Sequence, residues 1–147
     1  MEELLELRSA VEAGRTHDAL RIIGEMEEMA KEDKLNKIRS FIAVLLEHLI
    51  KQHAEQRSSP SWERSILYAL DGISDTNTRR SAGGTYMTTD ELRKAIDEKF
   101  PIALRYAAKE AFGGVYTAKQ LAERVQIAAI KEQAMDYILN GMPESED

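Results

Sequence analysis

Four side chains near the middle of the chain have the types and spacing that could form a small binding site. His48 and Lys51 are three residues apart, so they share one face of a helix. Arg57 follows in a predicted turn, and Trp62 comes at the start of the next predicted helix. Two cations beside an imidazole and an indole would suit an anion, and histidine is the side chain whose charge changes near neutral pH. We therefore treat these four residues as a candidate anion- or metabolite-binding pocket that could also be catalytic.

A purely structural role explains the same four residues, and it is the interpretation we favour. His48 would then be a hydrogen-bonded residue at the edge of the core, and Trp62 would head the apolar stripe of its helix. Lys51 and Arg57 would be solvated, stacked, or paired with neighbouring glutamates. Side chains of His48 and Lys51 that point away from Arg57 would exclude the pocket.

A second basic feature is the pair Arg79 and Arg80, which precedes Gly83 and Gly84. A loop of this kind can bind an anion through its backbone N–H groups and its guanidinium groups. We favour a simpler role, in which the two arginines match the negative end of the preceding helix. Both stay candidate anion-binding residues.

The signatures of familiar enzyme and metal chemistry are missing from the sequence. There is no Cys, and there is no repeated Glu-x-x-His motif of the kind that binds two metals in helical bundles. His48 and His53 lie about 140° apart around a helix, so they cannot share one ion without distortion. No serine has a recognisable nucleophile motif, and no glycine-rich phosphate motif follows a strand. We therefore expect no metal and no cofactor, and a non-enzymatic protein is the better expectation.

Helices must position these residues, because helix-forming residues dominate the composition. Gly and Pro number only 8 and 3, and we find no convincing strand. The stretch 33–56, with an apolar run over 41–46, predicts a long central helix that is surrounded by the others. The sequence thus predicts an all-α fold, a single-domain helical bundle of about six helices. The domain would cover residues 1–142, with a frayed acidic tail at 143–147.

The first two helices are expected to form a hairpin. One covers residues 2–13, and the second follows a cap at Thr16 and stops before Asp33, which would cap the central helix. The apolar spacing places the following residues on the buried side of the hairpin: Leu4, Leu5, Leu7, Val11, Ala19, Leu20, Ile23 and Met26.

Three later helix starts are specified by capping residues. The pairs are Ser59 with Pro60, Thr88 with Glu91, and Thr117 with Gln120. Pro101 bends or restarts the helix that follows Thr88. The last helix is expected to run without a break over residues 118–140.

The charge pattern argues against a nucleic-acid partner. The net charge is −6, with 10 acidic and 4 basic residues in 1–33, 5 and 8 in 34–80, and 11 and 8 in 81–147. An acidic chain binds nucleic acid poorly, because affinity comes largely from neutralising phosphates. The longest apolar run is six residues, far below the roughly 20 that span a bilayer. With no Cys and no visible signal peptide, we expect a soluble cytoplasmic protein that binds no membrane.

A family resemblance rests on the residues around the predicted helix break. In order along the chain come Leu45-Leu46-Glu47-His48-Leu49-Ile50-Lys51, then Arg57, then Ser61-Trp62 and Ser65-Ile66. This order resembles the hallmark of a bacterial family catalogued as domain of unknown function twenty-nine, which joins a His-Leu-x-Lys helix to a Ser-Trp helix. The resemblance implies a helical fold, and it implies no activity because the family has none assigned.

The function we predict is a non-enzymatic helical module that contacts another protein, as an inhibitor or antitoxin-like partner does, or that pairs with a second copy as a homodimer. The last helix is the candidate contact surface, because its apolar face is wider than one neighbouring helix would cover. They are Leu121, Val125, Ile127, Ile130, Ala134 and Ile138. The alternative is that both apolar sides of this helix are buried in the core of the bundle.

Overall fold

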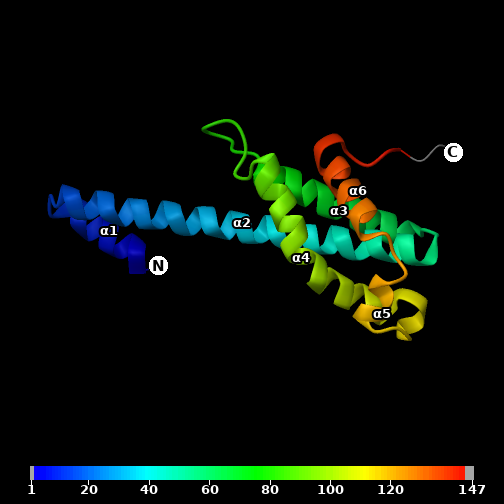
Figure 1. Cartoon of the computed structure of the whole chain (residues 1–147). Coiled ribbons are helices and arrows are strands. Elements are labelled where there is room, and N and C mark those ends of the chain that lie inside the picture. The colour runs from blue at the N-terminus through cyan, green and yellow to red at the C-terminus, as the bar shows by residue number, and fades with distance from the viewer. Residues whose placement is uncertain (1, 145–147) are drawn as a thin grey trace. The chain divides into compact units, whose positions relative to one another are not determined.

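The structure is a computed structural model that describes residues 2–144, and its regular elements are helices (Figure 1). In chain order they are α1 (Glu2–Glu12), α2 (Thr16–Glu55), α3 (Pro60–Asn77), α4 (Thr89–Glu110), the 3₁₀ turn η1 (Ala111–Gly114), α5 (Ala118–Ala122) and α6 (Ile127–Asn140). Over residues 2–144 there is no strand, only an isolated bridge between Thr78 and Thr85. The predicted all-α fold is confirmed.

The contacts of the chain divide it into two compact units, Met1–Asn36 and Lys37–Asp147. The predicted domain boundary at residue 142 stays a prediction. Within the expected acidic tail, residues 145–147 lie outside the described residues. No helix within residues 2–144 combines the length and the apolar character that a membrane crossing requires.

The predicted helix start at Asp33 is wrong, because α2 is one helix of 40 residues from Thr16 to Glu55. It joins the second helix of the expected hairpin to the expected central helix. A capping residue stabilises a helix end but does not create one, and no proline interrupts this stretch. Gly24, the weakest helix former of this stretch, costs about 1 kcal/mol in a helix interior, which good helix formers on both sides offset.

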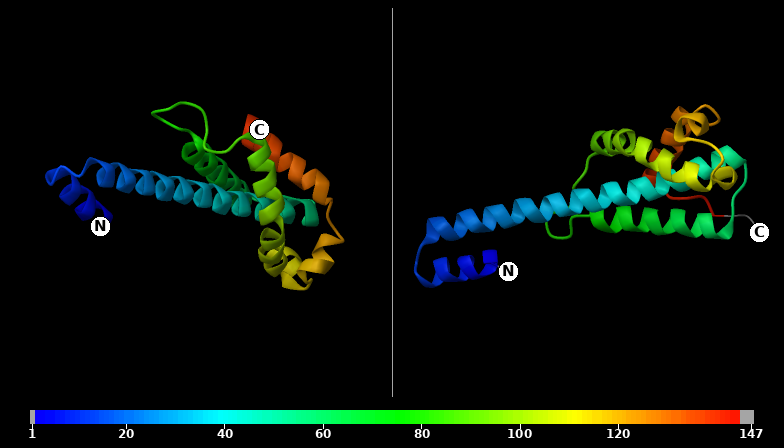
Figure 2. Two further views of the ribbon diagram at one scale, coloured as in Figure 1. Left: turned by 60° about the vertical axis from the view of Figure 1, so that its left-hand side comes forward. Right: turned by 90° about the horizontal axis from the view of Figure 1, so that it is seen from below.

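The core of the second unit forms around the later part of α2. Six of its aliphatic residues are fully buried: Ile38, Ile42, Leu45, Leu46, Leu49 and Ile50. Their spacing covers more than one side of the helix, as expected for a helix with neighbours on several sides. Helix α3 lies alongside this part of α2 (Figure 2). Gly72 of α3 permits a close approach, since a Cβ there would lie 2.5 Å from the ring of Phe41 on α2.

The predicted helix starts of the second unit are confirmed. The hydroxyl of Ser59 accepts a hydrogen bond from the backbone N–H of Trp62, and Pro60 takes the first helical position. Both predicted capping boxes are present, Thr88 with Glu91 and Thr117 with Gln120. Each of these starts is specified within four residues of sequence.

Pro101 lies inside α4 and does not restart it, because the helix is continuous from Thr89 to Glu110. Proline removes one backbone donor and crowds the preceding turn. The course of α4 changes direction along its length (Figure 1). The expectation of a bend therefore agrees with the structure, and the expectation of a restart does not.

The last helix is broken, so the prediction of one continuous helix over 118–140 is wrong. Helix α5 ends at Ala122, and α6 begins at Ile127 after a non-helical Gln126 with φ −93° and ψ 89°. Leu121 and Ile130 are nine residues apart, which is about 180° around a straight helix. Both are fully buried. A single helix would point them in opposite directions, and the break allows both to enter the core.

Candidate functional site

Lys51 is the centre of the predicted constellation, and only 1% of its surface is exposed. Its Nζ lies 2.5 Å from Oε2 of Glu110 at the end of α4 and 3.1 Å from Oε2 of Glu47, one turn earlier on α2. Two carboxylates therefore balance one buried ammonium group. A buried charge needs such partners, because its desolvation is otherwise costly.

Both cationic side chains of the constellation lie over the indole ring of Trp62. The Nζ of Lys51 lies 5.7 Å from the ring centroid, and the guanidinium carbon of Arg57 lies 4.5 Å from it. Arg57 also donates to Oε1 of Glu55 at 3.0 Å, and the other oxygen of Glu55 accepts from the backbone N–H of Phe112. The structure thus brings Lys51, Arg57 and Trp62 together, with each cation already paired to a carboxylate.

His48 borders the same cluster through Glu47. Its Nδ1 donates to the backbone carbonyl of Val44 at 2.8 Å, since a carbonyl oxygen can only accept. Its Nε2 lies 3.9 Å from Oε2 of Glu47. This is the hydrogen bonding of a residue at the edge of the core.

Glu110 has a pKa below the ordinary value of 4.5, mainly because it accepts a hydrogen bond from Lys51, with the charges of Lys51 and His48 adding to the effect. A carboxyl whose pKa is lower in the folded state stabilises the fold above its unfolded pKa. That stabilisation is lost as the pH falls through the folded pKa. The stability of the protein should therefore depend on Glu110 at neutral pH and not in strong acid.

We expect Glu110→Gln to lower the free energy of unfolding at neutral pH by about 1 kcal/mol or less, because its side chain is 64% exposed and solvent screens the pair. The difference from wild type should begin to shrink as the pH falls below 4.5 and should vanish once the pH lies below the lowered pKa of Glu110. Urea titrations across the acidic range measure both values. Glu98→Gln, an exposed residue of the same helix, is the matched control and should show no such trend. A difference that persists in strong acid would contradict the assigned pairing.

Arg79 and Arg80 lie in the loop after α3. The backbone N–H of Arg79 donates to the carbonyl of Gly84 at 3.0 Å, and its guanidinium carbon lies 5.6 Å from the ring centroid of Tyr86. Gly83 and Gly84 both adopt positive φ, which the tight turn requires. Arg79 therefore contacts its own loop, and Arg80 is exposed.

Half of the residues of the predicted contact surface at the end of the chain lie inside the core of the second unit. Leu121, Ile130 and Ala134 are fully buried. The other three residues, Val125, Ile127 and Ile138, are half-buried. Each of these three side chains therefore keeps part of its surface accessible to solvent.

The N-terminal hairpin carries the exposed apolar surface that sequence reasoning missed. Within the described residues 2–36 of the first unit, the buried residues are Ala10, Ala19 and Ile22, with Leu7 and Met26 packed against them. The large apolar residues with 38% to 64% of their surface exposed are Leu4, Leu5, Val11, Leu20, Ile23 and Met29. The predicted inward placement of Leu4, Leu5, Val11, Leu20 and Ile23 is wrong, because two helices bury only the facing stripe of each. Adjacent apolar pairs such as Leu4-Leu5 could have indicated this exposure, because neighbouring residues point in different directions on a helix and one facing stripe cannot bury both.

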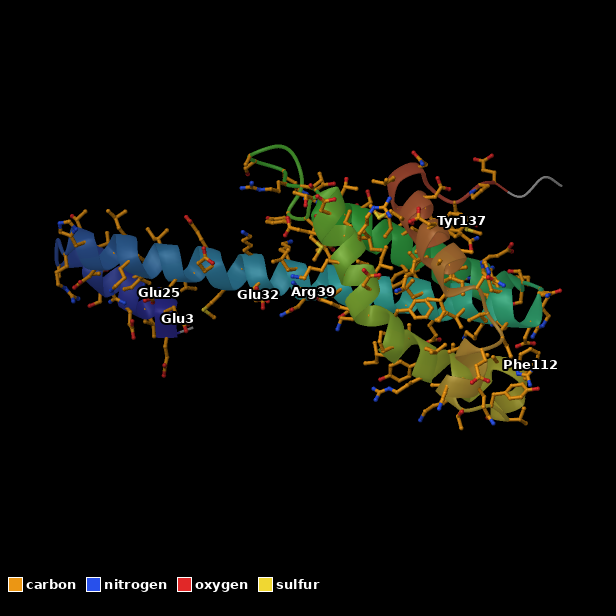
Figure 3. The ribbon with its side chains drawn as sticks, in the orientation of Figure 1. Glu3, Glu25, Glu32, Arg39, Phe112 and Tyr137 are labelled. Carbon is orange, nitrogen blue, oxygen red and sulfur yellow. The ribbon has the colours of Figure 1, made fainter. Side chains whose placement is uncertain are left out.

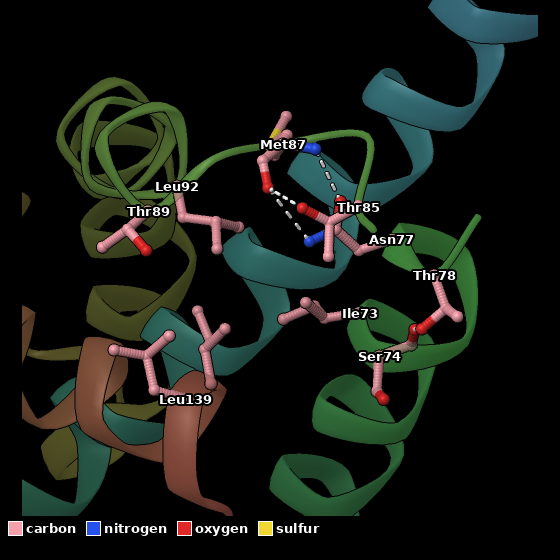
Figure 4. A pocket seen from close by; sticks show the side chains of 10 residues that line it. Ile73, Ser74, Asn77, Thr78, Thr85, Met87, Thr89, Leu92 and Leu139 are labelled. Atoms are coloured by element: carbon pink, nitrogen blue, oxygen red, sulfur yellow. Dashed lines mark hydrogen bonds between the residues drawn. The ribbon is translucent and has the colours of Figure 1, made fainter. Parts of the chain in front are cut away.

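A pocket of about 220 Å³ lies between the end of α3, the loop before α4, the start of α4 and the end of α6 (Figure 4). Its aliphatic lining includes Ile73, Leu92 and Leu139, and its polar lining consists of hydroxyls and the amide of Asn77. The side chain of Asn77 accepts from the backbone N–H of Met87 at 2.7 Å. None of the lining residues is charged, so the pocket offers no general acid or base. Within residues 2–144 no group of three or more His, Asp or Glu side chains could hold a metal ion.

The fold and these contacts define an all-helical protein with a buried, internally neutralised cation between α2, α3 and α4. The chain belongs to the family described as Domain of unknown function DUF29, whose match covers residues 7–136. The resemblance seen in the sequence is thereby confirmed. No curated protein and no solved structure matches the chain.

Proposed function

We propose that this protein is a non-enzymatic interaction module that contacts a partner protein through its N-terminal hairpin. The observation that carries the proposal is the exposure of six large apolar side chains in that unit, where Ile22 is the one large aliphatic residue among residues 2–36 that is buried. Single exposed apolar residues are normal on a protein surface, but a group on two adjacent helices is typical of a contact site. An inhibitor or antitoxin-like protein would use such a surface.

Helical spacing places part of this apolar surface on one side of α1. Leu4 and Val11 are seven residues apart, so they lie on nearly the same side of α1, next to the half-buried Leu7. On α2, Ile23 lies next to the buried Ile22 in sequence and is 38% exposed. A partner helix placed along this face would remove apolar surface from water, which contributes a favourable free energy of about 25 cal/mol for each Å² buried.

The charge of the hairpin indicates what kind of partner fits. Residues 1–36 contain 10 acidic and 5 basic residues, a net charge of −5. Glu3 and Glu25 are among the acidic residues, from α1 and α2 respectively (Figure 3). Like charges oppose pairing with a second copy of the hairpin, and a basic partner surface would be attracted. The homodimer is therefore the weaker form of this proposal.

The anion pocket at His48, Lys51, Arg57 and Trp62 is the second candidate function. It is supported by the approach of two cations to one indole ring. A ligand anion there would compete with Glu47, Glu55 or Glu110 for those cations. Because of this competition, we rank anion binding below protein interaction as the candidate function.

Replacing Leu4, Val11 and Leu20 by Ser should abolish recovery of a partner when the tagged protein is purified from its native cell, because apolar burial is lost at the contact. Three exposed residues of the other unit, Leu67, Tyr106 and Val115, replaced by Ser form the matched control and should leave recovery unchanged. Light scattering on purified wild type separates partner binding from self-association.

A third variant tests the surface predicted at the end of the chain, with Ser at Val125, Ile127 and Ile138. Loss of the partner in this variant, together with retention in the hairpin variant, would move the contact to α6. Recovery that is equal in every variant would exclude both surfaces. Circular dichroism of each variant shows whether the helical fold is retained.

A further inference from the structure

A polar groove of about 450 Å³ lies between the end of α2 and the connection from α5 to α6, entirely within the second unit. The residues that matter here are His53, Arg124 and four glutamines, Gln52, Gln56, Gln126 and Gln133. The volume falls in the range of about 300–1,000 Å³ that is usual for small-molecule sites. The groove exists because the last helix is broken, since Arg124 and Gln126 belong to the break.

Arg124 is the only arginine or lysine that lines the groove, and no carboxylate pairs with it in the described part of the chain. Its guanidinium carbon lies 4.1 Å from the ring centroid of Tyr116. Stacking on an aromatic ring holds the planar group by its face and leaves its N–H edge for an acceptor. Arg57, by contrast, is stacked on Trp62 and also bonded to Glu55.

His53 is held in one tautomer by a chain of hydrogen bonds. Its Nε2 lies 2.5 Å from Oε1 of Gln133, and because that oxygen can only accept, the imidazole donates. The amide nitrogen of Gln133 donates in turn to the hydroxyl of Tyr137, which lies on α6 (Figure 3). Nδ1 of His53 has no partner within residues 2–144, so it can accept from a ligand.

No acidic side chain lines the groove, so the charge of Arg124 is not balanced there. Gln126 makes no side-chain capping bond to α6, and its amide is available to a ligand as donor and acceptor. We propose that this groove binds a small organic anion, whose carboxylate or phosphate group meets Arg124 and whose uncharged polar groups meet His53 and the glutamine amides. This site is independent of the hairpin surface.

The test is a titration of the whole isotope-labelled protein followed by NMR, with adenosine monophosphate, succinate and uncharged adenosine as probes. We expect saturable shifts of the Arg124 side-chain N–H and of the groove amides with one of the anions at millimolar concentration or below. Adenosine should bind at least about tenfold more weakly than its monophosphate, because a charge-assisted hydrogen bond is worth about one power of ten or more. A response to the phosphate or to the carboxylate shows which group the site accepts.

Arg124→Gln should weaken binding of the responding anion by about tenfold or more and leave the backbone spectrum otherwise unchanged. The matched control is Arg105→Gln, which removes one exposed arginine from α4 and should bind like wild type. The absence of saturable shifts with both anions would overturn the proposal. Binding of adenosine as tight as that of the responding anion, or equal losses in the two arginine variants, would also overturn it.

Discussion

Leu45→Asp is expected to unfold the second unit, with a loss of more than about 4 kcal/mol in the free energy of unfolding. Leu45 is fully buried in the later part of α2. An aspartate there would be an unpaired charge in the core, or a neutral carboxyl without hydrogen-bond partners. A total stability of about 5–15 kcal/mol leaves little after such a loss. Thermal and urea unfolding followed by circular dichroism measure the change.

The neighbouring residue provides the control for this prediction. Val44 precedes Leu45 on the same helix, and 37% of its surface is exposed. Val44→Asp should cost less than about 1 kcal/mol, because its carboxylate can reach water. Similar melting of Leu45→Asp and wild type would contradict the position of α2 at the centre of the core.

Lys51→Ala should destabilise the protein by about 3 kcal/mol, and Lys51→Met by about 1 kcal/mol. Alanine would leave a cavity beside Trp62, whereas methionine keeps most of the volume of the buried aliphatic stem. Glu110 is 64% exposed and can return to water when the ammonium group is removed. The two variants thus separate the packing of the stem from the charge, and urea titrations measure both.

Lys109→Ala, at an exposed position next to Glu110, is the control for a missing surface lysine and should change stability by less than about 0.5 kcal/mol. Equal losses in Lys51→Ala and Lys51→Met would mean that the ion pairs, and not the stem, dominate. If inorganic phosphate raised the melting temperature of wild type and not of Lys51→Met, the anion pocket would become the better interpretation of this cluster.

The exposure of apolar residues in the hairpin shows where sequence reasoning about the fold was incomplete. Apolar spacing identified α1 and its partner correctly as amphipathic, but the expected buried side included Leu4, Val11 and Leu20, which are exposed. Periodicity reports how wide an apolar face is, and it does not report how much of that face a neighbour covers. The width of the face was therefore visible in the sequence, and its exposure was not.

The candidate site was predicted in part, for a similar reason. The shared face of His48 and Lys51 and the nearness of Arg57 and Trp62 follow from helix geometry and one short turn. The pairing of Lys51 with Glu110 joins residues 59 positions apart, and no local pattern in the sequence indicates it. That pairing turned a candidate anion site into an internally balanced cluster.

The sequence by itself determined the helical class, the family and the helix starts at Ser59, Thr88 and Thr117. Each of these starts depends on a hydrogen bond between residues three apart, so the local sequence is sufficient. The tertiary structure alone decided the break between α5 and α6. Leu121 and Ile130 point in opposite directions on a straight helix, and only the burial of both in one core offsets the loss of helical hydrogen bonds between them.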